Sequence, residues 1–190
     1  VALAAYSALQ GCVTLIEKPR EEALRLGKFE TYKGSIDGVV IGGPHGDSDY
    51  NNALLVRDLI SYTQASGVVD TGFILGSGHR IDVNVPGEDN PAASRTTSLT
   101  LTTRGRIVND EYRRLIHKVA NGEPSLYFEI HDNSLPQTSN TIEVDTLGVV
   151  REEARRIKNI FYNLRDSVLK DAPKLEFRIF PIDSIYWTAT

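Results

Sequence analysis

The sequence predicts an α/β fold, and three observations support this prediction. The chain has 190 residues, enough for one domain with a buried core but too few for two full domains. Hydrophobic residues make up 41% of it and charged residues 24%, values typical of a folded globular protein. From Val39 onward, short apolar runs alternate with longer amphipathic patterns, as they do in proteins with an α/β sheet.

The elements of the first half follow from these patterns. Val39 to Ile41 is an apolar run that leads into Gly42-Gly43-Pro44, which predicts a buried strand that ends in a loop. Residues 51–65 carry leucine and isoleucine at helical spacing, which predicts a helix, and residues 68–75 predict a second strand. In residues 79–85, apolar and polar side chains alternate. A short strand there would present Arg80, Asp82 and Asn84 on one side.

The second half begins with a polar stretch. Residues 86–103 are rich in Ser, Thr, Asn, Asp, Gly and Pro, which predicts a long functional loop or lid. The apolar periodicity of residues 103–120 and 147–169 predicts two amphipathic helices. Strand-like runs at 126–131 and 175–180 complete the pattern, the second ended by Pro181.

Charge and cysteine content exclude several classes of protein. The net charge is −4 and the basic residues form no long run, so the chain lacks the electrostatic signature of a nucleic-acid binder. A single cysteine forms no internal disulfide and no Cys-x-x-Cys zinc site. Motifs for nucleotide binding (Gly-x-Gly-x-x-Gly or Gly-Lys-Ser/Thr) and for a serine nucleophile (Gly-x-Ser-x-Gly) are absent. Any metal ion is therefore expected on histidine and carboxylate ligands.

The first twelve residues carry a different signal. They are uncharged and mostly apolar, and Leu9-Gln10-Gly11-Cys12 resembles a bacterial lipobox, in which the cysteine receives lipid. This predicts that residues 1–12 are the remnant of a signal peptide, with a lipid anchor at Cys12, on an exported lipoprotein of the cell envelope. Residues 13–190 would then form a single α/β domain. The alternative is a buried first element in a cytoplasmic protein; in either case no stretch predicts a transmembrane span.

Two histidines follow predicted strands and stand beside carboxylates. His45 is followed by Asp47 and Asp49, and His131 ends a strand later in the chain. Ligands bind at the carboxyl ends of the strands in an open α/β sheet. A catalytic zinc ion commonly takes two histidines and one carboxylate and keeps one position for water, whose pKa it lowers toward about 7. The sequence therefore predicts a metal site that contains both histidines.

Three motifs in this order carry a resemblance to a known family: Gly42-Gly43-Pro44-His45-Gly46-Asp47, then residues 79–84, then Glu129-Ile130-His131. They resemble the zinc carboxypeptidase-like amidohydrolases, most closely the branch of N-formylglutamate amidohydrolase and poly-γ-glutamate hydrolase. The resemblance covers about residues 36–185. It implies a three-layer α/β/α fold with a mixed, mostly parallel sheet, and zinc-assisted hydrolysis of an amide next to a carboxylate.

The resemblance also implies the ligands. They are His45, His131 and one nearby carboxylate, for which Asp49 is the first choice and Asp47 the alternative, around one Zn²⁺ ion per chain. Glu129 would orient a ligand or the reacting water. The alternative for Glu129 is an ordinary ion pair with an arginine.

Residues 79–84 resemble the substrate-binding segment of the family. Arg80, Asp82 and Asn84 would bind substrate, with Arg80 also stabilising the oxyanion and His79 lying at the rim. Val85 stands where the family has a second arginine, which weakens the expectation of carboxylate recognition. A surface strand with an ordinary Asp–Arg pair is the alternative.

The remaining roles are less closely tied to motifs. Arg95 or Arg104 would substitute for the missing arginine. Glu176 would act as general base unless that base lies beyond Thr190, where a further segment is expected. The expected protein is thus a zinc-dependent hydrolase of an N-acyl amino acid or a γ-glutamyl peptide. The alternatives are an envelope protein that binds a metal or ligand without turnover, and a metal-free binding module.

Overall fold

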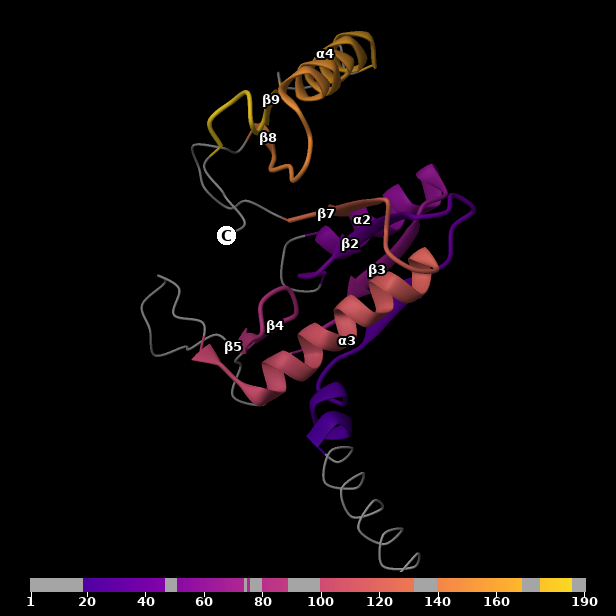
Figure 1. The fold of residues 1–190 in the computed structure, drawn as a ribbon, viewed down its shortest axis with the longest axis vertical. Coiled ribbons are helices and arrows are strands. Elements are labelled where there is room, and N and C mark those ends of the chain that lie inside the picture. The colour runs from indigo at the N-terminus through magenta and orange to yellow at the C-terminus, as the bar shows by residue number, and fades with distance from the viewer. Residues whose placement is uncertain are drawn as a thin grey trace, which may run out of the picture. The chain divides into compact units, whose positions relative to one another are not determined.

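The computed structural model describes residues 19–46, 51–73, 75, 80–88, 100–131, 140–168 and 175–185. The chain divides into two compact units, Val1–Asp132 and Asn133–Thr190 (Figure 1). Both contain helices and strands, so the α/β class expected from the sequence is confirmed. A single domain over residues 13–190 stays a prediction.

The first unit is organised around a four-stranded mixed sheet. The two central strands, β2 and β3, are parallel, and β2 is also parallel to β7 on its other side. The remaining strand, β1, pairs with β3 in the antiparallel direction. The spatial order is β1-β3-β2-β7, and the strands are β1 (Phe29–Tyr32), β2 (Val39–Gly43), β3 (Ser66–Asp70) and β7 (Leu126–Glu129).

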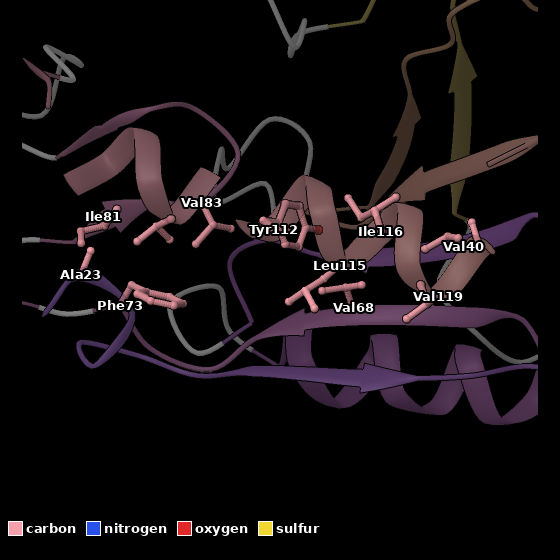
Figure 2. Packing of buried hydrophobic residues seen from close by; sticks show 12 residues of the cluster. Ala23, Val40, Val68, Phe73, Ile81, Val83, Tyr112, Leu115, Ile116 and Val119 are labelled. Carbon is pink, nitrogen blue, oxygen red and sulfur yellow. The ribbon is translucent and has the colours of Figure 1, made fainter. Parts of the chain in front are cut away.

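One helix covers each face of this sheet, because the central strands are apolar on both sides. Val40 of β2 packs in the same cluster as residues of α3 (Thr103–Ala120), whereas Ile41 packs with α2 (Asn52–Thr63). Figure 2 shows the first cluster, in which Tyr112 and Leu115 of α3 lie against the sheet. Both helices were predicted from their apolar periodicity. The first unit therefore has helix, sheet and helix in three layers.

A smaller antiparallel sheet lies beside α3, and its strands are β4 (Ile81–Asp82), β5 (Gly87–Glu88) and β6 (Thr100–Leu101). The strand expected over residues 79–85 is reduced to Ile81–Asp82. The backbone turns after Asp82 because the Oδ1 atom of Asp82 accepts hydrogen bonds from the N–H groups of Asn84 and Val85. Residues 86–103 were expected to form a long loop. Their described parts contain β5 near the start and β6 near the end.

The second unit contains β8 (Thr141–Val144), α4 (Arg151–Val168) and β9 (Glu176–Ile179). The two strands are parallel, and α4 packs on β9 through a small core of Ala154, Phe177 and Ile179. The sequence predicted α4 and β9 to within a few residues. It did not predict β8, and it did not predict β1 in the first unit. The strand expected over 68–75 begins at Ser66 and ends at Asp70.

The signals found near the amino terminus lie outside the described residues, and this includes Cys12 and its lipobox-like neighbours. The helix over residues 19–24 is described, and Ala23 joins the main hydrophobic cluster of the first unit. Among the described helices, none combines the length and the apolar character needed to cross a bilayer.

Candidate metal centre

His45 and His131 meet at the carboxyl ends of two neighbouring strands. His45 lies two residues after β2 and His131 two residues after β7, and these strands are parallel with Gly42 paired to Glu129. The Nδ1 atoms of the two rings are 3.3 Å apart, and the rings meet edge to face at 73°. Their side chains are 15% and 26% exposed, so solvent reaches both. Strand topology thus brings together two residues that are far apart in the sequence.

The far side of the His45 ring is held by Asp82. His45 Nε2 lies 3.2 Å from Asp82 Oδ1, the same oxygen that accepts the backbone N–H groups of Asn84 and Val85. Burial alone would raise the pKa of Asp82, but the hydrogen bond with His45 and those from the backbone lower it below its ordinary range. Asp82 is therefore an ionised acceptor at neutral pH.

The far side of the His131 ring faces a second carboxylate. His131 Nε2 lies 3.4 Å from Glu129 Oε2, and the hydroxyl group of Tyr127 donates a 2.6 Å hydrogen bond to Glu129 Oε1. Burial alone would raise the pKa of Glu129. The hydrogen bonds from His131 and Tyr127, with a further one from the Asn84 side chain, lower this pKa instead. Glu129 is therefore also ionised at neutral pH.

These contacts determine which ring nitrogens carry protons. An ionised carboxylate only accepts hydrogen bonds, so the Nε2 atoms of His45 and His131 must be the donors. A neutral imidazole that is protonated at Nε2 has its lone pair on Nδ1. The two Nδ1 lone pairs then face each other across 3.3 Å, and their repulsion is relieved only by a cation or a proton between them.

This geometry fits a zinc ion. Two nitrogen ligands at about 2.0–2.1 Å from a tetrahedral zinc ion lie about 3.3–3.4 Å apart, which is the separation of the two Nδ1 atoms. Histidine ligands of metals commonly donate their other N–H to a carboxylate, as both rings do here. The two ionised carboxylates behind the rings also supply negative charge that a divalent cation balances.

The third expected ligand is not among the described residues. Asp47 and Asp49 both lie in the stretch 47–50, and His79 also falls outside the described ranges. Within those ranges, no three side chains of His, Cys, Asp or Glu are grouped so as to hold a metal ion. The choice between Asp49 and Asp47 stays a prediction.

Two residues of the segment expected to bind substrate contact the side chains around the histidines, and the substrate-binding roles of Asp82 and Asn84 stay predictions. Asp82 contacts His45, and Asn84 contacts the carboxylate of Glu129 while its backbone N–H binds Asp82. Arg80 is half-buried directly before β4. Its expected roles in holding substrate and stabilising an oxyanion stay predictions.

Two other side chains have partners that bear on their expected roles. Arg104 donates from Nε and Nη2 to both carboxylate oxygens of the buried Glu88, so its guanidinium group is largely occupied by that pair. Glu176 lies on β9 in the second unit and is exposed. A hydrogen bond from Arg178 lowers the pKa of Glu176, which makes its carboxylate a weaker base.

Sequence reasoning missed three residues of this region. Tyr112 and Tyr127 lie at apolar positions of a helix and a strand, where an aromatic side chain is ordinarily part of the core. Asp70 is 3% exposed at the end of β3, close enough to Tyr112 to help raise the pKa of that tyrosine. Of the three residues, only Asp70 has a signal in the sequence. It is a carboxylate at the end of an otherwise apolar strand, Gly67-Val68-Val69-Asp70.

Comparisons of the chain with family models, with curated proteins and with solved structures gave no match. The function proposed below is therefore inferred from the site and from the motifs that form it.

Proposed function

We propose that this protein is a zinc-dependent hydrolase that cleaves an amide bond of an N-acyl amino acid or a γ-glutamyl peptide. The observation that carries the proposal is the pair of facing Nδ1 atoms of His45 and His131, each ring backed by a carboxylate on Nε2. The motifs around these residues resemble the zinc carboxypeptidase-like amidohydrolases, and the three-layer first unit is compatible with the fold of that family.

The residues of the chain have distinct tasks in this proposal. His45, His131 and Asp49 hold the ion, with Asp47 as the alternative to Asp49. When bound, zinc supplies a water of lowered pKa and polarises the scissile carbonyl.

Other side chains prepare the site. Asp82 and Glu129 keep the two rings oriented and protonated at Nε2. Arg80 is proposed to bind substrate and to stabilise negative charge on the carbonyl oxygen, and Glu176 is the candidate general base.

The first experiment measures zinc by elemental mass spectrometry in the purified chain and in a His45→Ala, His131→Ala double variant. We expect about one zinc ion per wild-type chain and none in the double variant, because removal of two ligands leaves too few donors. His117→Ala is the matched control, since His117 is an exposed histidine on α3 that pairs with Glu123. It should keep its zinc.

Two results would contradict the proposal. One is a wild-type chain that takes up no zinc even after zinc is supplied. The other is a double variant that retains as much zinc as the wild type.

A second function, metal or ligand binding without turnover, is favoured by Val85. That residue stands where the resembling family has an arginine, and its backbone N–H is bound to Asp82. Arg178 lowers the pKa of Glu176, which makes Glu176 a weaker general base and also favours binding without turnover.

Activity toward N-formyl and γ-glutamyl amino acids separates the two functions. Glu129→Gln and Glu176→Gln are tested one at a time in zinc-loaded protein. An enzyme must lose rate in at least one of these variants while its zinc content is unchanged. A zinc-loaded wild type that hydrolyses none of these compounds would favour the binding protein.

A further inference from the structure

Two tyrosines, the buried Tyr112 and the half-buried Tyr127, lie in a row behind Glu129. The Tyr127 hydroxyl is 2.6 Å from Glu129 Oε1, and the Tyr112 hydroxyl is 3.0 Å from that of Tyr127. A tyrosine hydroxyl has one hydrogen, and Tyr127 donates its hydrogen to Glu129. Tyr112 must therefore donate to the oxygen of Tyr127. The result is a directed series of hydrogen bonds from Tyr112 through Tyr127 to Glu129.

Both tyrosines are held as neutral donors by their surroundings. Burial is the main cause that raises the pKa of each, and the nearby charge of Glu129 raises both further. Neither hydroxyl therefore ionises near neutral pH, and Tyr127 continues to donate to the carboxylate.

The backbone of β2 leaves room for this pair of hydroxyls at Gly42. A Cβ atom at that position would lie 2.5 Å from the hydroxyl oxygen of Tyr112 and 2.5 Å from that of Tyr127. Since real Cβ atoms do not approach so closely, only glycine permits the hydroxyls to rest against the strand. This explains why the residue paired with Glu129 on the neighbouring strand, Gly42, is a glycine.

The lengths of the hydrogen bonds show which contact sets the position of Glu129. The bond from Tyr127 is short for O–H···O, whereas the 3.4 Å contact between Glu129 and His131 is longer than the usual N–H···O hydrogen bond. Tyr127 therefore holds the carboxylate more tightly than His131 does, and the Asn84 side chain is a further partner of Glu129. The orientation of the His131 ring depends in turn on that carboxylate.

We propose that Tyr127 is a positioning residue of the metal centre, which holds Glu129 so that His131 keeps its proton on Nε2 and presents the Nδ1 lone pair to His45. Tyr127 acts through Glu129, because its hydroxyl group is bonded to Glu129 and to the hydroxyl group of Tyr112. The inference rests on the proposed zinc function for its consequence in metal binding. Its consequence for the state of the His131 ring is independent of that function.

The alternative is that Tyr127 is only a core residue whose hydroxyl happens to find an acceptor. The two interpretations predict different effects when the Tyr127 hydroxyl group is removed. A core role affects folding stability alone, whereas a positioning role changes both zinc affinity and the proton position on His131.

The test compares Tyr127→Phe with Tyr32→Phe. Tyr32 is a matched control because its hydroxyl also donates a 2.6 Å hydrogen bond to a glutamate two residues away on the same strand, Glu30. Zinc affinity is measured in folded protein by competition with a chromophoric chelator. Tyr127→Phe should weaken zinc binding about tenfold, the lower end of the effect of residues that support metal ligands, and Tyr32→Phe by less than about twofold.

A second variant guards against misfolding. Tyr127→Phe leaves the buried Tyr112 donor without its acceptor, which is costly, whereas removal of both partners of a buried hydrogen bond is often nearly neutral. The double variant Tyr112→Phe, Tyr127→Phe is therefore measured beside the single one. It should show the same loss of zinc affinity.

A metal-free measurement completes the design. The ring ¹⁵N chemical shifts of His131 report which nitrogen carries the proton, and we expect Nε2–H in wild type and a mixture of tautomers in Tyr127→Phe. A shift in the tautomer without zinc uptake by the wild type would support the role of Tyr127 and reject the zinc hydrolase. Normal zinc uptake, with affinity and tautomer unchanged in Tyr127→Phe, would overturn the role of Tyr127 and leave the zinc centre intact.

Discussion

The carboxylate of Asp82 accepts three hydrogen bonds on Oδ1, one from His45 Nε2 and two from the backbone of the turn that follows. Asp82→Asn retains an oxygen for the turn but removes the charge that supports the His45 ring. We expect zinc affinity to fall about tenfold, with little change in the free energy of unfolding. Chelator competition and urea unfolding measure the two quantities.

Asp82→Ala separates the two tasks further. This change removes the acceptor of the Asn84 and Val85 N–H groups. In addition to weaker zinc binding, we therefore expect the free energy of unfolding to fall by about 1–3 kcal/mol. If Asp82→Asn binds zinc as tightly as wild type, the charge behind His45 is not needed. The proposed support of the ring by Asp82 would then be wrong.

The sequence indicated some site residues and not others, for physical reasons. His45, Glu129 and His131 stand out because polar groups at the ends of apolar strands are uncommon and converge at one edge of the sheet. Tyr127 does not stand out, because a tyrosine at an apolar strand position looks like core until its hydroxyl partner is known. The sequence predicts a substrate-binding role for Asp82, but the contact of Asp82 with His45 depends on a turn that period-two alternation does not predict.

The strand β1 and the helix α2 are joined by an ion pair that makes stability depend on pH. Arg57 on α2 donates from Nε and Nη2 to the two oxygens of Glu30 on β1, at 2.9 and 3.0 Å. This hydrogen bonding lowers the pKa of Glu30, with a further contribution from the Tyr32 hydroxyl. A carboxylate with a lowered pKa stabilises the fold above its unfolded pKa, and this stabilisation is lost as the pH falls through the folded value.

Glu30→Gln should therefore be less stable than wild type at pH 7 by about 0.5–1 kcal/mol, a modest value because the pair is partly exposed. The difference should shrink as the pH falls below about 4, the ordinary range of glutamate. Urea unfolding at pH 7 and pH 3 measures it. Asp58→Asn, at an exposed carboxylate on the same helix, is the control. A difference that is equally large at pH 3 would show that the charge of Glu30 is not its source.

Elements were predicted well where their patterns are long. α3 was expected over 103–120 and has those bounds, because eighteen residues with a buried stripe give a clear helical period. The two-residue strands β4, β5 and β6 are too short to show any period, and they exist because α3 and their neighbours hold them. β1 was missed because Phe29–Tyr32 is only four residues long and has two adjacent polar residues, Glu30 and Thr31, at its centre.

Zinc binding should stabilise the chain unevenly, because His45, His131 and their carboxylates all belong to the unit Val1–Asp132. A ligand that binds only the folded state adds about 2.7 kcal/mol when its free concentration is 100 times the dissociation constant. Hydrogen exchange, followed by mass spectrometry with and without zinc, locates that stabilisation. Exchange should slow in β2, β7 and β4, which carry or support the two rings, and stay unchanged in α4, β8 and β9.

The His45→Ala, His131→Ala variant is the control for this pattern and should show no change with zinc in any segment. Slower exchange in β8 and β9, with none in β2 and β7, would place the zinc site in the second unit and contradict the histidine centre.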